Sequence, residues 1–390
     1  MQKRILIVTD FSPNENGFAG PQTTYHFVKL LEKNFECKLL VHQLNFKLLG
    51  INEDWVANKD FQLFEYFIDV NWNNRFYKIL NFFKKLFNPR FFHFSNKNKA
   101  FIVGFEPEII IGIPNSPFLY KALINLKSQI PYAKLFCYIM DDYKLYDDFL
   151  VKNVIQKSFN KIEGWISISE NMASLFQTKF KNLKNKSYTV LQNPVPLDRM
   201  LTKKTWSFGK KSINIVYAGS VYPNHLDGLL QMIDSINDSD HNVFLDIYTK
   251  EEFRHHFQKF ESSKVCYKGS IAYRELTTIL HHYDFGLVTE TFTAEFAHFA
   301  RSSIQTKIND YLLAGCMIIA FGPTYGACVQ YILQNRLGLV LTNNQKGSIL
   351  DFLDSLPTKQ EYIDQLREVQ ENWIIRVKES ENLLIQLLNK

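Results

Sequence analysis

Short apolar runs alternate with amphipathic segments along most of this chain. In the first half the apolar runs have the composition of buried strands, and they lie at 3–10, 37–44, 107–113, 134–142, 164–169 and 188–194. The segments between them have helical spacing, as Phe27, Leu31 and Phe35 illustrate. Strands that alternate with helices in this way build parallel sheets with helices on both faces. The sequence therefore predicts an α/β, doubly wound fold.

The same alternation begins again near residue 212. A chain of 390 residues is too long for one ordinary core. The segment 193–196 contains two prolines, which stiffen a connection and continue neither sheet. We therefore predict a first domain at 1–200 and a second at 201–358.

The tail, residues 359–390, has helical periodicity over about 30 residues, which corresponds to a helix of about 45 Å. Two placements are consistent with it. The helix packs on the second domain, or it crosses back toward the first. We favour the crossing, because the helix is long enough for it.

Composition excludes several classes of protein. Apolar residues make up 46% of the chain, as in a globular protein. The five cysteines are scattered without metal-ligand spacing, which indicates reduced thiols in a cytosolic protein and predicts no metal site. The N-terminus reads as a strand and not as a signal peptide, and no run reaches the ~20 apolar residues of a membrane-spanning helix. We expect a cytoplasmic protein.

The segment 75–99 carries seven Lys/Arg and no acidic residue, with Phe residues interleaved. Its Phe side chains either pack on the first domain, leaving the lysines solvated, or lie on an anionic bilayer. Each Lys/Arg near such a surface contributes about 1 kcal/mol, and apolar rings bury beneath the headgroups. We favour membrane contact and expect a peripheral protein at the inner membrane face. Nucleic acid is not an expected partner, because the charge is local and no known binding module accompanies it.

A polar cluster at 301–307 leads into a short amphipathic helix that stops at Gly315, and a buried strand follows at once. Hydroxyls and N–H groups at a helix start form an anion site, to which Lys307 adds a positive charge. Asp310 follows one turn later, where a carboxylate can accept hydrogen bonds from a ribose diol. One segment thus combines phosphate-binding and sugar-binding chemistry.

Four strings in the second half, at 216–220, 265–280, 283–288 and 306–323, occur in an order and spacing that resemble the GT-B glycosyltransferases. The closest kind is the retaining family-4 type, which uses nucleotide-sugar donors. The resemblance implies two Rossmann-like domains around an interdomain cleft. It also implies sugar transfer with retention, no required metal and no cofactor apart from the nucleotide-sugar co-substrate.

The resemblance also assigns donor-binding residues. Gly219 and Ser220 would approach the pyrophosphate, and Ile271 or Tyr273 would pack on the nucleobase. Asp310 matches the carboxylate that binds the ribose. The diphosphate would be held by a cationic and hydroxyl set, namely Arg301, Ser303, Thr306 and Lys307, of which Lys307 would also act in catalysis.

The sequence departs from the family pattern in two places. The paired Glu-x7-Glu has become Ser302 and Asp310, so the role of the first Glu is unfilled. Glu290, Glu295 and Arg301 are nearby substitutes that the sequence does not rank. The Arg/Lys that many members place after the first strand of the second domain has no clear counterpart, and His225 and Asp227 stand in that region. Lys307 and Arg301 are the alternatives for the positive charge.

In the first domain, the loop after the first strand would contact donor phosphate or acceptor through Asn16, Gly17 and Gly20. Asp141 and Asp142 end a strand at the edge where the cleft is expected, so a carboxylate there is a candidate catalytic base or orienting group. Because adjacent strand residues face opposite sides, at most one of them meets the substrate.

The sequence thus predicts a glycosyltransferase that moves a sugar from a nucleotide-sugar to a glycan or lipid-linked acceptor in cell-surface polysaccharide synthesis. Two alternatives remain open. The first is a non-catalytic GT-B-like partner subunit, because Ser302 replaces the Glu. The second is a sugar-nucleotide epimerase of the same two-domain build.

Overall fold

A computed structural model describes residues 2–11, 13–15, 20–42, 61–64, 96–142, 144–201, 212–356 and 359–390. The chain divides into two compact units, Met1–Pro194 together with Ser380–Lys390, and Val195–Glu379. Most of the basic-aromatic segment, residues 75–95, lies outside the described residues. No helix in the described part is long and apolar enough to cross a membrane.

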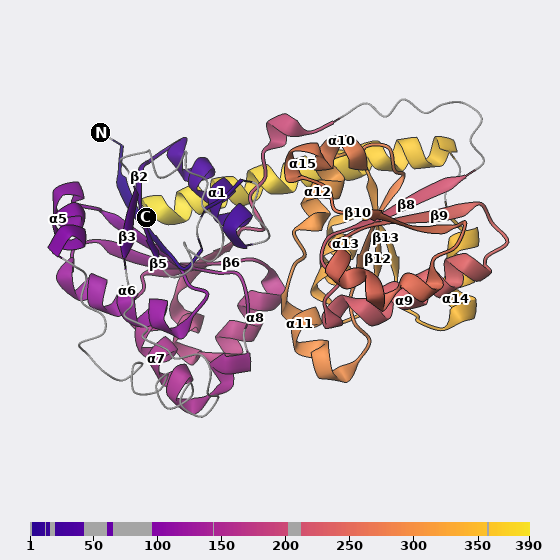
Figure 1. The fold of residues 1–390 in the computed structure, drawn as a ribbon. Coiled ribbons are helices and arrows are strands. Elements are labelled where there is room, and N and C mark those ends of the chain that lie inside the picture. The colour runs from indigo at the N-terminus through magenta and orange to yellow at the C-terminus, as the bar shows by residue number, and fades with distance from the viewer. Residues whose placement is uncertain are drawn as a thin grey trace. The chain divides into compact units, whose positions relative to one another are not determined.

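The first unit is built on a parallel sheet of seven strands in the order β3-β2-β1-β4-β5-β6-β7. Figure 1 labels β2, β3, β5 and β6 of this sheet. Its strands are β1 (Arg4–Thr9), β2 (Glu36–His42), β3 (Phe61–Phe64), β4 (Ile109–Ile113), β5 (Lys134–Ile139), β6 (Gly164–Ser167) and β7 (Ser187–Val190). Its helices are α1 (Gly20–Glu32), α5 (Asn96–Phe105), α6 (Pro117–Gln129), α7 (Phe149–Phe159) and α8 (Glu170–Lys179). Strands β1 and β4 are apolar and buried along almost their whole length, as expected for a sheet covered on both faces.

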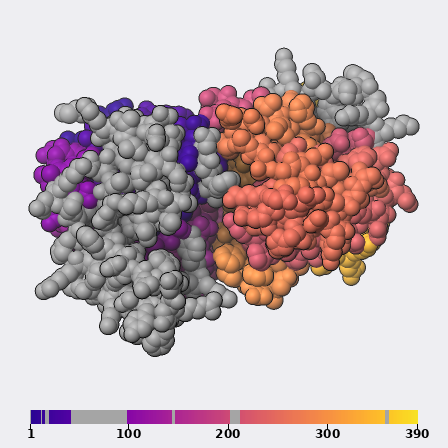
Figure 2. All heavy atoms as spheres, viewed as in Figure 1, coloured from indigo at the N-terminus to yellow at the C-terminus, as the bar shows by residue number. Residues whose placement is uncertain are grey.

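The second unit has a parallel sheet of six strands in the order β10-β9-β8-β11-β12-β13. Its strands are β8 (Ile213–Ala218), β9 (Val243–Tyr248), β10 (Val265–Gly269), β11 (Phe285–Thr289), β12 (Met317–Phe321) and β13 (Gly338–Leu341). Its helices are α9 (Pro223–Asp238), α10 (Tyr273–Leu280), α11 (Ala297–Ser302), α12 (Lys307–Leu313), α13 (Ala327–Asn335) and α14 (Lys346–Asp354). In the space-filling view of Figure 2, segments coloured salmon to orange form most of the visible face of this unit.

Both sheets reverse their strand order beside the first strand of the unit. This switch point lies between β1 and β4 in the first unit and between β8 and β11 in the second. In open α/β sheets, ligands bind outside the carboxyl ends of the strands at such a point. The α/β, doubly wound fold predicted from the sequence is confirmed in both units.

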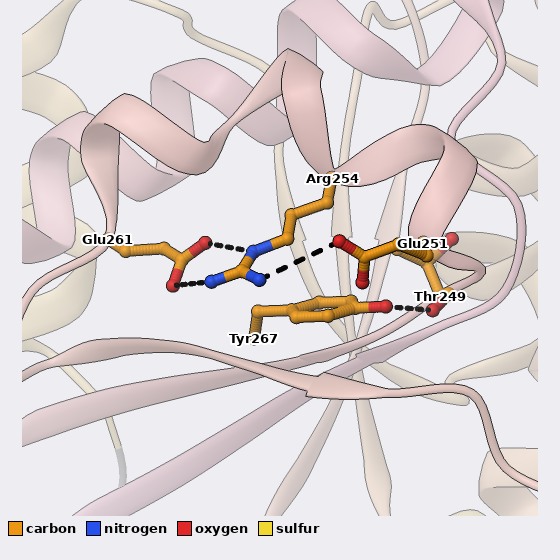
Figure 3. Close-up of polar contacts among 5 residues, drawn as sticks. All are labelled: Thr249, Glu251, Arg254, Glu261 and Tyr267. Carbon is orange, nitrogen blue, oxygen red and sulfur yellow. Dashed lines mark hydrogen bonds and ion pairs between the residues drawn. The ribbon is translucent and has the colours of Figure 1, made fainter.

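The crossover from β9 to β10 lacks the expected α-helix and consists of the 3-10 helices η5 (Glu251–His256) and η6 (Gln258–Phe260). Arg254 anchors it, as Figure 3 shows. The guanidinium lies 4.8 Å from the centroid of the Tyr267 ring. Its Nε and Nη2 donate to the two carboxylate oxygens of Glu261, at 2.9 and 3.2 Å. Tyr267 in turn donates to the carbonyl of Thr249 at 3.2 Å, so the crossover is fixed to the end of β9.

Helix α15 (Lys359–Asn389) is as long as the sequence predicts, and it contributes to both units. In the second unit Tyr362 and Trp373 are fully buried, and the Tyr362 hydroxyl donates to the carbonyl of Asp284. In the first unit Leu384 and Leu388 are buried, and Lys3 donates to the carbonyl of Asn389 at 3.2 Å.

Candidate donor site in the second unit

The switch point of the second unit brings together the ends of β8 and β11. Gly219 directly follows β8, and Glu290 directly follows β11. Helix α12, which carries Lys307 and Asp310, is anchored across both strands by Tyr311. The buried Tyr311 hydroxyl accepts from the backbone N–H of Ala218 at 2.9 Å and donates to the carbonyl of Leu287 at 3.2 Å.

Glycine in the middle of β11 makes room for this anchor. A β-carbon on Gly286 would lie 2.1 Å from Cγ of Tyr311, so any larger residue would displace the ring. The position of α12, and of the residues predicted to bind the donor, therefore depends on a small residue in the neighbouring strand.

The ammonium of Lys307 is buried and lacks a hydrogen-bond partner in the described part of the chain. The residue is 9% exposed, and Nζ lies 3.6 Å from the centroid of the Tyr217 ring. No described group forms a hydrogen bond with it. Burial lowers the pKa of Lys307 to about 7. A buried cation without a hydrogen-bonding partner is costly, so the position is suited to an anion that arrives from outside.

Gly219 lies at the surface directly above this ammonium. Its backbone has φ of +136°, a conformation that favours glycine. A β-carbon there would lie 3.2 Å from Cε and 3.4 Å from Nζ of Lys307. A ligand atom that approaches the backbone of Gly219 therefore comes within reach of the lysine, as the sequence predicts for a phosphate oxygen.

His225, in the first turn of α9, occupies the region where the sequence lacks the expected Arg/Lys. Its Nδ1 lies 3.2 Å from the carbonyl oxygen of Thr289 and 3.3 Å from Nε2 of Gln305. Burial, with the charge of Lys307 as a smaller cause, lowers the pKa of His225 to about 3. The imidazole is therefore neutral at physiological pH and supplies no positive charge.

The remaining residues predicted to hold the diphosphate have different environments. Thr306 is the N-cap of α12, and Ser303 is the C-cap of α11; both are half-buried. Arg301 is exposed, and its guanidinium lies 4.9 Å from the centroid of the Tyr325 ring. Asp310 is half-buried, and burial raises the pKa of its carboxyl to about 7, against the opposing charge of Lys307.

The predicted nucleobase residues follow β10, at the edge of the sheet. Ile271 lies in the connection and Tyr273 opens α10, and both are half-buried. Ser220, the other predicted pyrophosphate contact, is also half-buried, and its carbonyl accepts from the Tyr217 hydroxyl at 2.9 Å.

Glu290 is the buried member of the three substitutes considered for the missing Glu. Its Oε1 and Oε2 accept from the backbone N–H groups of Cys328 and Val329, both at 3.2 Å, at the start of α13. Burial raises the pKa of Glu290 to about 7 in spite of these bonds. Glu295 is exposed. The Glu290 carboxyl therefore caps a helix whose N-cap residue, Gly326, has no side chain to do so.

In the first unit, Asp142 is buried in an ion pair. Its Oδ1 accepts from Nζ of Lys179 at 2.7 Å, and the same Nζ lies 2.8 Å from Asp147. Asp141 is half-buried. The structure thus gives Asp142 a partner in the same unit, which the sequence did not indicate.

Gly20 is the first residue of α1, and a β-carbon there would lie 2.3 Å from the Phe11 ring. Packing against Phe11 therefore accounts for this glycine without a ligand. The other predicted residues of that loop, Asn16 and Gly17, lie outside the described residues.

Two polar residues escaped the sequence analysis: Asp10, which is buried at the end of a strand, and Gln305, which is half-buried in the connection between α11 and α12. Asp10 follows β1, and its Oδ2 accepts from the backbone N–H of Asn115 and the hydroxyl of Ser116, at 3.1 and 2.8 Å. Gln305 precedes α12, and its Nε2 donates to the carbonyl of Thr289 at 2.7 Å. Neither belongs to a recognisable motif, and an Asp after a first strand gave the only available signal. Among the described residues, no group of three or more His, Cys, Asp or Glu side chains could hold a metal ion.

Comparison with known proteins finds similarity in fold and not in sequence. No protein-family model matches the chain, and a search of the curated proteins found no match. HepE of Anabaena, solved in complex with UDP and glucose, is 10% identical over 99% of each chain, with a TM-score of 0.64. Sucrose-phosphate synthase from Thermosynechococcus elongatus is 10% identical over 100% of each chain, with a TM-score of 0.67. The lipopolysaccharide outer core galactosyltransferase WaaB is 11% identical over 95% of this chain and 98% of its own, with a TM-score of 0.60.

The similarity covers both units and defines the class of structure. The chain has the GT-B fold, with two Rossmann-like domains in tandem. The fold predicted from the resemblance in the second half of the sequence is therefore confirmed.

Proposed function

We propose that this protein is a glycosyltransferase that takes its sugar from a nucleotide-sugar donor. The observation that carries the proposal is the buried ammonium of Lys307, which lacks a hydrogen-bond partner in the described part of the chain and lies beneath Gly219 at the switch point. A donor diphosphate is an anion of suitable chemistry for this position. Because His225 is neutral, the positive charge would come from Lys307, with Arg301 as the other predicted cation.

The chemistry of the site follows from this placement. When the bond between the sugar and the diphosphate breaks, negative charge develops on the leaving phosphate. A preorganised cation at that point stabilises the transition state more than it stabilises the ground state. Lys307 would play this role, Ser220, Ser303 and Thr306 would supply hydroxyl donors, and Asp310 would accept from the ribose. We propose retention at the anomeric carbon without a required metal or cofactor, on the resemblance to family 4.

The structural neighbours support a nucleotide-sugar donor. HepE was solved with UDP, with UDP and glucose, and with UDP-glucose. WaaB is a galactosyltransferase, and sucrose-phosphate synthase also has this fold. These likenesses are at 10–11% identity, so the donor of this chain needs its own test.

We further propose that the acceptor is a glycan or a lipid-linked glycan in cell-surface polysaccharide synthesis, and that the enzyme works at the inner membrane face. The basic and aromatic composition of residues 75–99 supports this part of the proposal. An enzyme with a lipid-linked acceptor benefits from an electrostatic attraction to the membrane that holds the acceptor.

A non-catalytic GT-B-like subunit is the second candidate. Two observations favour it, since Ser302 occupies the position of the family Glu and the Glu290 oxygens are engaged by α13. Slow hydrolysis of the donor distinguishes the two candidates. In the absence of an acceptor, a transferase slowly transfers the donor sugar to water, and a non-catalytic subunit does not. No observation favours the epimerase reading.

A binding screen tests the proposed donor site. Wild-type protein, Lys307→Met and the control Lys378→Met, an exposed lysine of α15, are titrated with UDP, GDP, CMP and their sugar conjugates. A ligand at a hundredfold excess over its Kd adds about 2.7 kcal/mol to stability, which a thermal shift detects. We expect at least one nucleotide-sugar to stabilise wild type and Lys378→Met, with at least tenfold weaker binding to Lys307→Met. Absence of binding to wild type, or equal binding to all three proteins, would reject the proposal.

A further inference from the structure

Gln305 presents a buried hydrogen-bond acceptor that the sequence analysis and the proposed donor contacts leave unused. Its Nε2 donates to the carbonyl of Thr289 at 2.7 Å, while its Oε1 is buried without a partner among the described residues. A buried acceptor left unpaired costs about 1–3 kcal/mol. The Gln305 amide contacts His225, and the charge of Lys307 lowers the pKa of that same histidine, so the three side chains belong to one cluster. A ligand hydroxyl at this cluster would give the unpaired acceptor a partner.

The orientation of the amide follows from the chemistry of its neighbours. A carbonyl oxygen only accepts hydrogen bonds, so the group of Gln305 that faces Thr289 must be the NH₂. Nδ1 of His225 lies 3.3 Å from the same NH₂ group. The Thr289 contact therefore fixes Oε1 on the opposite branch of the amide, where it can only accept.

Oε1 of Gln305 and the ammonium of Lys307 require different chemical groups of a ligand. An ionised phosphate has no proton to donate to Oε1, and a hydroxyl offers no charge to the Lys307 ammonium. Both atoms are satisfied by a molecule that carries an anionic group with a hydroxyl nearby. A sugar attached to a phosphate has this combination, and the sugar of a nucleotide-sugar is the part next to the phosphate.

We propose that Oε1 of Gln305 accepts a hydrogen bond from a hydroxyl of the transferred sugar, so that Gln305 is a specificity residue for the sugar. This inference rests on the proposed function. Gln305 would then make a contact with the transferred sugar, a role for which Ser302, at the position of the first Glu of the family pattern, is not suited. His225 and Thr289 act as positioning groups, because they hold the amide that makes the contact.

The test compares nucleotides with and without the sugar. For whichever nucleotide binds wild type, UDP or GDP, the Kd of the free diphosphate and of its glucose, galactose and mannose conjugates is measured by calorimetry. The variants are Gln305→Ala and a control, Gln334→Ala, which removes an exposed glutamine of α13. We expect Gln305→Ala to weaken the binding of a sugar conjugate roughly three- to tenfold, which corresponds to the loss of one neutral hydrogen bond. The Kd of the free diphosphate should stay within about twofold of the wild-type value.

A second arm identifies the hydroxyl. Conjugates in which one sugar hydroxyl at a time is replaced by fluorine cannot donate from that position. One of these conjugates should bind wild type more weakly than the unmodified conjugate does. Its Kd should be the same for Gln305→Ala as for wild type, because the two changes remove the same interaction. This arm also separates a sugar contact from a general disturbance of the site.

The outcomes are distinct. Equal weakening of diphosphate and conjugate would show that Gln305 only shapes the phosphate site, and unchanged binding of both would show no ligand contact; either result overturns the inference while leaving the donor site intact. If wild type binds neither class of ligand, the proposed function itself fails.

Discussion

The ammonium of Lys307 lies 3.6 Å from the centroid of the Tyr217 ring, the closest cation–π approach among the described residues. An aromatic face attracts a cation without using its hydrogen-bond donors. The ring therefore holds the lysine in place while leaving its N–H groups for an anion. This arrangement explains how a buried lysine can be retained before any ligand binds.

The first prediction concerns the pH dependence of donor binding. Because burial lowers the pKa of Lys307 to about 7, the free protein loses this charge as the pH rises through 7. Bound phosphate favours the charged form. Binding of a nucleotide-sugar should therefore be strongest below pH 7 and weaken above it, by up to about tenfold per pH unit.

Calorimetry between pH 6 and 8.5 measures this effect, with a nucleotide-sugar as ligand because its phosphates do not titrate in that range. Lys307→Arg is the matched variant, since a guanidinium stays charged. Its affinity should vary less with pH than that of wild type, and the variation that remains is expected from Asp310, whose pKa burial also raises to about 7. A flat profile for wild type would contradict the charge assigned to Lys307.

The second prediction compares two glycines with positive φ. Gly219 has φ of +136° and its β-carbon would meet Lys307, whereas Gly269 has φ of +83° and its β-carbon would meet nothing within 4 Å. Alanine at either position costs about 1–2 kcal/mol of backbone strain. Only Gly219→Ala should also weaken nucleotide-sugar binding, by tenfold or more.

Urea unfolding measures the strain, and titration with the nucleotide-sugar measures the binding. Gly269 directly precedes the segment of Ile271 and Tyr273, which is assigned to the nucleobase. If Gly269→Ala weakens binding as much as Gly219→Ala does, backbone strain within the donor site and not the approach to Lys307 would explain the loss.

The sequence predicted the fold because each strand and helix is locally consistent with it. The runs at β4 and β12 are apolar throughout, and those at β1 and β11 are apolar except at their ends, as is typical of buried parallel strands. Gly315, which has φ of +74°, marks the end of α12 in the sequence and in the structure. Local patterns of this kind need no knowledge of distant contacts.

The details of the site depended on contacts between distant segments, which no local pattern encodes. The burial of Lys307 against Tyr217 joins residues on α12 and β8. The engagement of Glu290 by Cys328 and Val329, and of Asp142 by Lys179, likewise joins segments 37 to 39 residues apart. The motif predicts that the lysine contacts an anion, and this stays a prediction; the sequence offered no means to choose among the acidic residues.

The third prediction concerns the stability contributed by Glu290. Burial raises its pKa from 4.5 to about 7, so the folded protein keeps the proton that the unfolded chain releases between these values. The unfolded state then binds fewer protons, and stability falls as the pH rises from about 4.5 to 7. For this group the loss is on the order of 3 kcal/mol.

Glu290→Gln removes the titration. Urea unfolding of wild type and of this variant at pH 5 and pH 7.5 should show wild type losing more stability over the interval. Parallel losses in the two proteins would mean that the carboxyl is not held protonated at the start of α13.

The fourth prediction concerns membrane binding, which the sequence predicts and the described residues leave untested. Replacing four basic residues of the 75–99 segment by serine removes electrostatic attraction worth about 1 kcal/mol per charge before screening. The amount of protein that sediments with phosphatidylglycerol vesicles should fall at least tenfold; the four residues are Lys78, Lys84, Lys85 and Arg90.

The control removes the same number of charges from exposed positions elsewhere in the first unit, namely Lys157, Lys161, Lys181 and Lys184. Its sedimentation should stay within about twofold of wild type. Equal loss in both variants would indicate an effect of net charge, and unchanged sedimentation of the first variant would contradict membrane contact through this segment.

The last prediction tests whether Asp142 stabilises the fold through its ion pair with Lys179 or acts on the substrate. Asp142 and Lys179 are 9% and 10% exposed at their side chains, and a buried pair that loses one partner leaves an uncompensated charge. Lys179 also contacts the more exposed Asp147, which would still partly compensate its charge and so reduce the loss of stability in Asp142→Asn. We expect Asp142→Asn to reduce the free energy of unfolding by about 1–3 kcal/mol.

A double-mutant cycle of Asp142→Asn with Lys179→Met should give a coupling energy above about 1 kcal/mol, because the two side chains are in direct contact. The exposed pair of Lys346 and Asp234, with half-exposed side chains, is the control and should give less than about 0.5 kcal/mol. The two outcomes have different meanings. Suppose that the Asp142–Lys179 coupling is as small as that of the control pair and that Asp142→Asn abolishes transferase activity. Asp142 then acts on the substrate, as predicted from its position at the strand end.

Suppose instead that the Asp142–Lys179 coupling is large and that Lys179→Met impairs activity as much as Asp142→Asn does. The ion pair then supports the strand end, and the half-buried Asp141 is the remaining carboxylate to test as the base.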